Sequence, residues 1–316
     1  MATPPDLSRH EVFDVLTHSR ARLLRSVALG DGLAAAVWRN AADATRYSKP
    51  SHHTLSLYLS GGHDTWRHEA PALRGEPGRL CVMPAGHESR WVVGSEQSFV
   101  HLYFDEAQLA PLAVRLLDRE PREVQVPDLT FVADAGVANP LRALAMLDWQ
   151  DPQARLQANA LGHEALATLL VAHGARGHRT PPRGGLSAHV RRRLVDWTEA
   201  RLDQPLTIGE MAAVAALSEH HFARMFRTSF GLAPHAWVLW LRIERAKQLL
   251  RHSDAPLDEV ARQCGLASAS HLVNRFRART GVTPGAYRAM ARLTTTASGS
   301  PPPPHPAAAS AARRRA

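Results

Sequence analysis

The feature that most constrains this chain is an internal repeat in its last third. Residues 225–237 read MFRTSFGLAPHAW and residues 275–287 read RFRARTGVTPGAY. Both contain the pattern F-R-x3-G-x2-P-x2-aromatic, at a constant offset of 50 residues. Five matches in register at one offset indicate two copies of one structural unit.

The first copy begins with the pattern of two short helices joined by a tight turn. Thr207 and Glu210 have the spacing of a capping box, which predicts a helix over residues 207–216. Ser218 then caps a second helix over residues 219–230. The apolar residues of this second helix recur at intervals of three and four, as in an amphipathic helix.

The second copy repeats this organisation. Residues 257–264 form its first helix, and Gly265 suits the position after that helix, where positive φ is needed. Ser268 or Ser270 caps its second helix. Apolar residues at helical spacing over residues 235–253 predict one long helix between the copies. The sequence therefore predicts two helix-turn-helix units.

Residues 187–290 resemble the DNA-binding domain of the AraC family of transcriptional regulators. The matching motifs are Phe222-x-Arg224-x-Phe226-Arg227, Gly231-x2-Pro234, Arg242-Ile243-Glu244-Arg245-Ala246-Lys247, Val260-Ala261-x2-Cys264-Gly265 and Phe276-Arg277-x3-Gly281-x-Thr283-Pro284-x2-Tyr287. The chain departs from the family at Leu266 and Leu272, where family members carry Phe, but both residues remain apolar.

The resemblance implies a sequence-specific regulator with recognition helices one turn of DNA apart, roughly 34 Å. The candidates for reading bases are His220, Ala223, Arg224, Ser270, His271 and Asn274, and the candidates for binding phosphate are Arg227 and Arg277. Arginine can pair bidentately with guanine and asparagine with adenine. The outward residues of the second recognition helix are less basic than those of the first. This difference predicts that the second helix reads fewer bases and contacts the DNA backbone more. A solvated helix face is the alternative for any single residue.

The resemblance also implies partners: a promoter operator in double-stranded DNA, RNA polymerase for an activator, a small-molecule effector and a second copy of the chain. The charge distribution agrees with a polyanionic partner, although a merely soluble basic domain would show it too. Residues 1–186 carry 19 basic and 20 acidic side chains, residues 187–290 carry 15 and 9, and residues 291–316 carry four arginines and no acid.

The N-terminal part predicts an α+β organisation ahead of the helical domain. Helical spacing over residues 8–29 predicts an amphipathic helix. Short apolar runs between residues 32 and 104 predict strands, with another over residues 124–132. The motif Gly78-x5-Pro84-x-Gly86 resembles part of a cupin motif, which implies a cupin-like β-barrel that binds the effector.

Neither a metal nor a cofactor is expected in this barrel. His52 and His53 are adjacent, so on a strand they point to opposite faces, and the other histidines do not reproduce cupin ligand spacing. The candidates for lining an effector pocket are His53, Leu55, Leu57, Trp66, Met83 and Trp91.

Three classes of protein are compatible with these patterns. An effector-responsive regulator fits best, and the chain is not expected to be an enzyme. The alternatives are an enzyme, either a cupin-type oxygenase or a DNA-repair methyltransferase, fused to DNA-binding helices, and a non-specific architectural protein. A repair methyltransferase needs an activated cysteine. Cys81 lies in a buried-strand pattern and Cys264 at a helix end, so neither fits.

Residues 140–174 predict two helices broken near Asp151-Pro152. Their leucines are expected either to dimerise or to pack against the barrel.

The predicted segments are an N-terminal helix at 1–31, the barrel at 32–135, the helical dimerisation segment at 136–175, a linker at 176–186, the double helix-turn-helix domain at 187–290 and a disordered tail at 291–316. The chain has neither a signal pattern nor an apolar run of about 18 residues, so a cytoplasmic protein without a membrane partner is expected. The barrel is expected to act on the helical domain through the linker.

Overall fold

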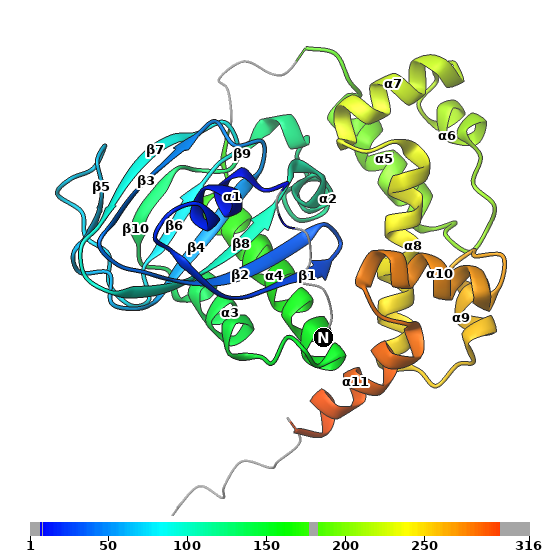
Figure 1. The fold of residues 1–316 in the computed structure, drawn as a ribbon. Coiled ribbons are helices and arrows are strands. Elements are labelled where there is room, and N and C mark those ends of the chain that lie inside the picture. Colours follow the sequence, from blue (N-terminus) through cyan, green and yellow to red (C-terminus); the bar gives the residue numbers. More distant parts are fainter. Residues whose placement is uncertain (1–6, 8, 177–182, 298–316) are drawn as a thin grey trace, which may run out of the picture.

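The computed structural model describes residues 7, 9–176 and 183–297. It contains a mixed N-terminal domain and a helical C-terminal domain (Figure 1). This arrangement confirms the predicted mixture of sheet and helix followed by an all-helical domain. In the part of the chain so described, no helix is long and apolar enough to cross a membrane.

The strands of the N-terminal domain form two main antiparallel sheets. The six-stranded sheet has the order β1 (Arg22–Gly30), β2 (Leu33–Asn40), β8 (Gln97–Phe104), β4 (His53–Ser60), β6 (Leu80–Met83) and β10 (Leu129–Val132). The three-stranded sheet has the order β3 (Asp43–Ser48), β7 (Glu88–Val93) and β5 (Thr65–Arg67). Aromatic side chains of both sheets share one core between them.

The two sheets are hydrogen-bonded only within themselves, so the described strands do not close into the predicted barrel. A closed barrel needs a continuous ladder around its circumference. The predicted apolar runs do form β2, β4, β6, β7 and β8, whereas the more polar β3 and β5 were not predicted.

The predicted helix over residues 8–29 is wrong for its second half. Helix α1 (Glu11–Thr17) ends early, and the following residues form β1, which pairs with β2 along its length. Val27 and Leu29 are buried in the sheet core. A turn at Asp31-Gly32, with positive φ at both residues, joins the two strands. Pairing across this turn therefore overrides the local helical spacing.

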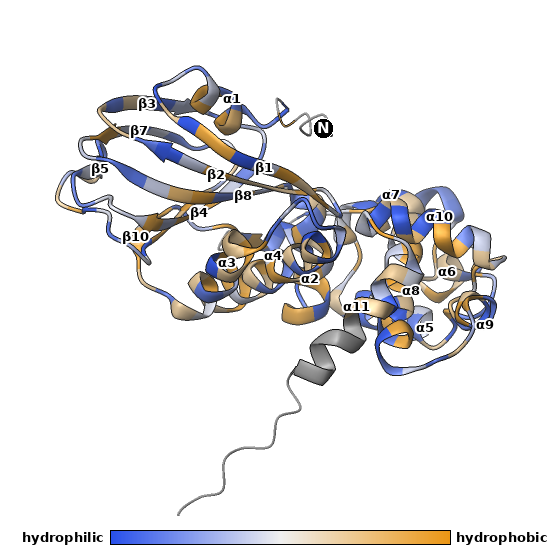
Figure 2. Ribbon diagram, turned by 60° about the horizontal axis from the view of Figure 1, so that its bottom comes forward, coloured by the Kyte–Doolittle hydropathy of each residue, from blue (hydrophilic) through white to orange (hydrophobic). Residues whose placement is uncertain are grey.

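Two helices cover the outer face of the six-stranded sheet, α3 (Ala135–Met146) and α4 (Pro152–His173) (Figure 2). The predicted break is confirmed, because the Asp151 carboxylate accepts hydrogen bonds from the first turn of α4. Leu166, Leu169 and Leu170 are buried against the sheet. The leucines of α4 are thus used within the chain, which is the packing alternative, and dimerisation through this segment stays a prediction.

Helix α2 (Glu106–Leu117) follows β8 and was not predicted. After it come the short helix η1 (Pro121–Glu123) and β9 (Val124–Gln125). Strand β9 pairs with β11 (Ala175–Arg176), so the chain entering the predicted linker is held beside the N-terminal domain. Residues 177–182 of that linker lie outside the described residues.

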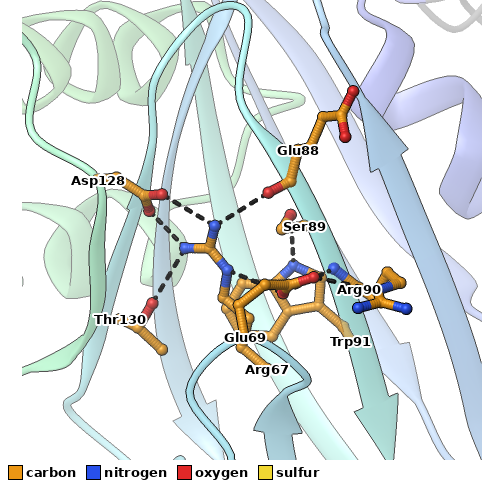
Figure 3. A network of polar contacts seen from close by, with 8 residues as sticks. All are labelled: Arg67, Glu69, Glu88, Ser89, Arg90, Trp91, Asp128 and Thr130. Carbon is orange, nitrogen blue, oxygen red and sulfur yellow. Dashed lines mark hydrogen bonds and ion pairs between the residues drawn. The ribbon is translucent and has the colours of Figure 1, made fainter.

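A network around Arg67 ties the smaller sheet to β10 (Figure 3). The guanidinium donates to both carboxylate oxygens of Asp128, at 2.5 and 2.8 Å, and to the Thr130 hydroxyl at 3.2 Å. It also donates to the Glu88 carbonyl at 3.1 Å and to Glu69 at 3.3 Å. The Arg67 side chain is only 8% exposed, so its charge depends on these partners.

We expect Arg67→Met to destabilise the N-terminal domain by about 1.5 kcal/mol, because it removes the charged hydrogen bonds to Asp128 that join the smaller sheet to β10, while the half-exposed Asp128 itself stays solvated. The stability of Arg67→Lys should lie between that of the wild type and that of Arg67→Met, since lysine keeps the charge but cannot make the bidentate contact with Asp128. Urea unfolding measures the effect. Unchanged stability of the methionine variant would show that the network does not hold the sheets together.

The C-terminal domain consists of seven helices in the described residues: α5 (Ala188–Glu199), α6 (Ile208–Val214), α7 (Glu219–Phe230), α8 (Pro234–His252), α9 (Leu257–Gln263), α10 (Ala269–Thr280) and α11 (Pro284–Ala297). Helix α11 continues past residue 290, so the first seven residues of the predicted disordered tail are helical. The rest of that tail, residues 298–316, lies outside the described residues.

Candidate nucleic-acid interface

The first helix-turn-helix unit consists of α6 and α7, and its capping box is confirmed. The Thr207 amide donates to the Glu210 carboxylate at 2.8 Å, and the Glu210 amide donates to the Thr207 hydroxyl at 3.2 Å. Ser218 occupies the N-cap position of α7, although its hydroxyl makes no capping hydrogen bond.

A stripe of stacked aromatic side chains fixes the rotation of α7. Phe222, Phe226 and Phe230 are fully buried, and the rings of Phe226 and Phe230 stack at 3.9 Å. Phe230 in turn meets Trp237 of α8 edge-on at 4.9 Å. Because this stripe is buried, the opposite face of α7 must point outward.

That outward face carries the candidates of the first unit. His220, Arg224 and Arg227 are exposed, and Ala223 is half-buried. Neither arginine forms an ion pair with any residue that the structure describes, so both guanidinium groups are available for an external partner.

The second unit, α9 and α10, repeats the arrangement. Gly265 follows α9 with φ of 65°, as predicted. Of the two predicted caps, Ser268 is the one used, and its hydroxyl accepts from the His271 amide at 3.1 Å. Phe276 is buried and meets Tyr287 of α11 edge-on at 5.2 Å.

The outward face of α10 carries Ser270, Asn274 and Arg277, all exposed, and the half-buried His271. Arg275 is also exposed and donates its Nε hydrogen to His271 Nε2 at 3.2 Å. Arg275 was missed as a candidate. Arg275 directly precedes the buried Phe276, so the sequence pattern did not single it out as an outward residue. Helical geometry nevertheless puts it one turn after His271, on the outward face. With Arg275 included, the second face is no less basic than the first.

The helix-turn-helix domain family matches residues 211–290. "Probable transcriptional regulator LumQ" of Photobacterium leiognathi is 34% identical over 100 residues, which are 31% of this chain and 40% of that protein. "Regulatory protein PocR" of Salmonella typhimurium is 34% identical over 92 residues, 29% of this chain and 30% of that protein.

Among solved structures, the DNA-binding domain of AdpA in complex with a target DNA is 36% identical with a TM-score of 0.32, covering 33% of this chain and 95% of that one. The C-terminal domain is a helix-turn-helix domain of the AraC type. The match spans less than half the length of LumQ and PocR.

Ahead of the AraC-type domain, the two sheets enclose a small cavity of about 30 Å³. Met83 and Trp91 line it, as expected of an effector pocket. His101 and Tyr58 line it too and were not predicted.

The other predicted pocket residues lie elsewhere. Leu55 and Leu57 face the helices behind the sheet, and the His53 ring stacks on Phe104. Trp66 is half-buried beneath the Arg74 guanidinium. Strand β4 is buried on both faces, so apolarity alone could not tell which face turns inward.

Histidines are concentrated near this cavity. The His52 and His10 rings lie 5.0 Å apart, while the ring of His53, the first residue of β4, stacks on Phe104. Within the described residues, no group of three or more His, Cys, Asp or Glu side chains is arranged to hold a metal ion.

Burial controls the ionisation of this region. Together with the charge of the neighbouring His52, it lowers the pKa of His101 to about 3. Burial, with the charges of His52 and Arg9, lowers the pKa of His10 to about 4. Burial also raises the pKa of Cys81 to about 12 and that of Cys264 to about 11, so neither thiol is activated as a nucleophile.

We expect acid to destabilise the N-terminal domain from pH 6.5 downward. Folding keeps His10 and His101 neutral, whereas the unfolded chain binds protons with the ordinary pKa of 6.5, so stability is lost as pH falls through that value. Each histidine contributes about 1.4 kcal/mol per pH unit below it. Urea midpoints at pH 7, 6 and 5 measure the slope.

The variant His10→Gln should reduce this slope, whereas His63→Gln, at an exposed histidine, should not. Equal slopes for wild type and His10→Gln would mean that His10 does not titrate as argued.

Proposed function

We propose that the protein is a sequence-specific transcriptional regulator that binds promoter DNA through both helix-turn-helix units. One observation carries the proposal: two copies of the same unit each present outward, exposed arginines beside residues able to read bases. Arg224 and Asn274 are the strongest candidates for guanine and adenine. Arg227 and Arg277, one helical turn from the reading positions, suit phosphate contacts.

The N-terminal domain is proposed to bind a small-molecule effector between its sheets. A cavity of about 30 Å³ holds little more than a water molecule, so an effector would have to displace side chains to enter. Leu16 of α1 lines this cavity, which makes movement of α1 one way to open it. The mixed aromatic and polar lining suits a small amphipathic molecule.

Two alternatives gain no support. LumQ and PocR are named as regulatory proteins rather than enzymes, and both cysteines have raised pKa values. A non-specific architectural protein does not need two copies of a base-reading helix. A homodimer, RNA polymerase as a partner and a cytoplasmic location remain part of the proposal.

The test is genome-wide occupancy of the wild type beside Arg224→Ala, at one salt concentration. We expect the wild type to occupy a few promoters that share a split motif. The variant should lose them, because one bidentate arginine–guanine contact contributes about 1–3 kcal/mol of discrimination.

Arg39→Ala removes an equally charged, exposed side chain from the N-terminal domain and should bind like the wild type. Arg227→Ala should weaken binding at all sites alike, since phosphate contacts carry no sequence information. Diffuse and equal occupancy by wild type and Arg224→Ala would exclude the proposal and favour the architectural alternative.

A further inference from the structure

The N-terminal domain contacts both helix-turn-helix units at the same position of the repeat, the C-terminal end of the recognition helix. At the end of α7, a Cβ on Gly231 would lie 2.7 Å from Ala110 of α2. At the end of α10, a Cβ on Gly30 in the β1–β2 turn would lie 2.9 Å from the Thr280 carbonyl group. Gly231 and Gly281, which follows Thr280, correspond in the repeat.

The contact at α10 is centred on a buried charge. The Asp31 amide donates to the Arg279 carbonyl at 2.5 Å. The Asp31 carboxylate, only 2% exposed, lies 2.8 Å from Arg279 Nε, 3.4 Å from Lys247 Nζ and 3.3 Å from His163 Nε2. Lys247 also pairs with Glu244 at 2.8 Å. Three basic groups from α4, α8 and α10 thus converge on one carboxylate of the turn.

Asp31 is ionised at neutral pH. Burial alone would raise its pKa, but the hydrogen bond with His163 and the charges of Lys247, His163 and Arg279 outweigh that effect and lower the pKa to about 2. A buried carboxylate of this kind stabilises an interface only while its partners stay in place. Because Lys247 and Arg279 belong to the C-terminal domain, their contacts with Asp31 exist only in this docked arrangement.

The contact at α7 has a different character. Val114 of α2 belongs to the same apolar core as Phe226 and Phe230. Beside it, the buried Glu120 carboxylate accepts from the Ser229 hydroxyl at 3.4 Å and lies 3.9 Å from Arg191 of α5. Shared apolar packing anchors the first unit. The second unit is held by the Asp31 ion pairs and by Leu156 of α4, which lies in one apolar core with Phe276.

Docking at these ends leaves the reading faces uncovered. His220, Arg224, Ser270 and Asn274 are all exposed while both contacts are made. Figure 1 shows the β1–β2 turn pointing toward α8 and α10, with α7 at the far end of the domain. The N-terminal domain therefore bridges the two units, which α8 also joins.

We propose that the N-terminal domain is a clamp that fixes the separation of the two recognition helices, and that the Asp31 contact is its releasable half. The clamp rests on the proposed function, and it replaces action through the linker alone with direct contact at both recognition helices. A conformation that loses the Asp31 contact frees the second unit while the first stays anchored. Its consequence is control over which half-site spacing the protein accepts.

The first test breaks the turn contact by crowding. Gly30→Ala adds a Cβ against Thr280, and Gly86→Ala is its control, because both glycines have positive φ but nothing lies within 4 Å of a Cβ at Gly86. Hydrogen exchange of the full-length protein should quicken at the β1–β2 turn and the end of α10 in Gly30→Ala only, with α6 and α7 unchanged. Unchanged exchange at the end of α10 would overturn the clamp.

The second test measures spacing. The split motif from the occupancy experiment is rebuilt with base pairs inserted or removed singly between its halves. Wild type should lose about tenfold in affinity per step from the optimal spacing. Asp31→Asn should bind the optimal site about threefold more weakly and lose less than about threefold per step.

Asp64→Asn, which makes the same change at an exposed carboxylate, is the control and should behave as wild type. If the wild type binds no specific motif, the proposed function fails. The clamp is then tested only by the hydrogen exchange of Gly30→Ala and Gly86→Ala. If wild type binds specifically and Asp31→Asn shows the same spacing profile, the clamp is wrong and the proposed function stands.

Discussion

Burial of one aromatic stripe in each repeat is the constraint on which the rest of this structure depends. Phe226 and Phe276 occupy the same place in their units, and each lies in an aromatic cluster with the helix that follows. Such burial contributes several kcal/mol for each ring and leaves a recognition helix only one rotation. The outward positions of Arg224 and Asn274 follow from that rotation.

The same stripe determines where a second domain can attach. Because one face of each recognition helix is buried and the opposite face must stay free for a partner, its C-terminal end is the surface left for docking. The N-terminal domain uses that end in both units, once through the apolar Val114 and once through the charged Asp31. Regulation by direct contact is then compatible with an uncovered reading face.

The fold could be predicted from the sequence where the signals are local. The capping by Thr207, the turn at Gly265 and the amphipathic spacing of α7 and α10 are local signals, because each of them depends only on residues a few positions apart in the sequence. The strand runs of the N-terminal domain are also recognisable, but the residues of β1 have helical spacing, and their pairing with β2 depends on contacts across a turn. The inward face of β4 could not be assigned, since Leu55 and Ser56 are both buried.

The sequence by itself determined the duplicated units, the Thr207 capping box and most of the side chains that face outward, because helix periodicity and capping are short-range properties. Only the tertiary structure decided that the N-terminal strands form two sheets, that Arg275 joins the outward face through His271, and that Asp31 meets Lys247 and Arg279. The Asp31 contacts join residues more than two hundred positions apart. No local sequence pattern specifies these contacts. A buried carboxylate needs basic partners, and here the tertiary structure brings them from distant parts of the chain.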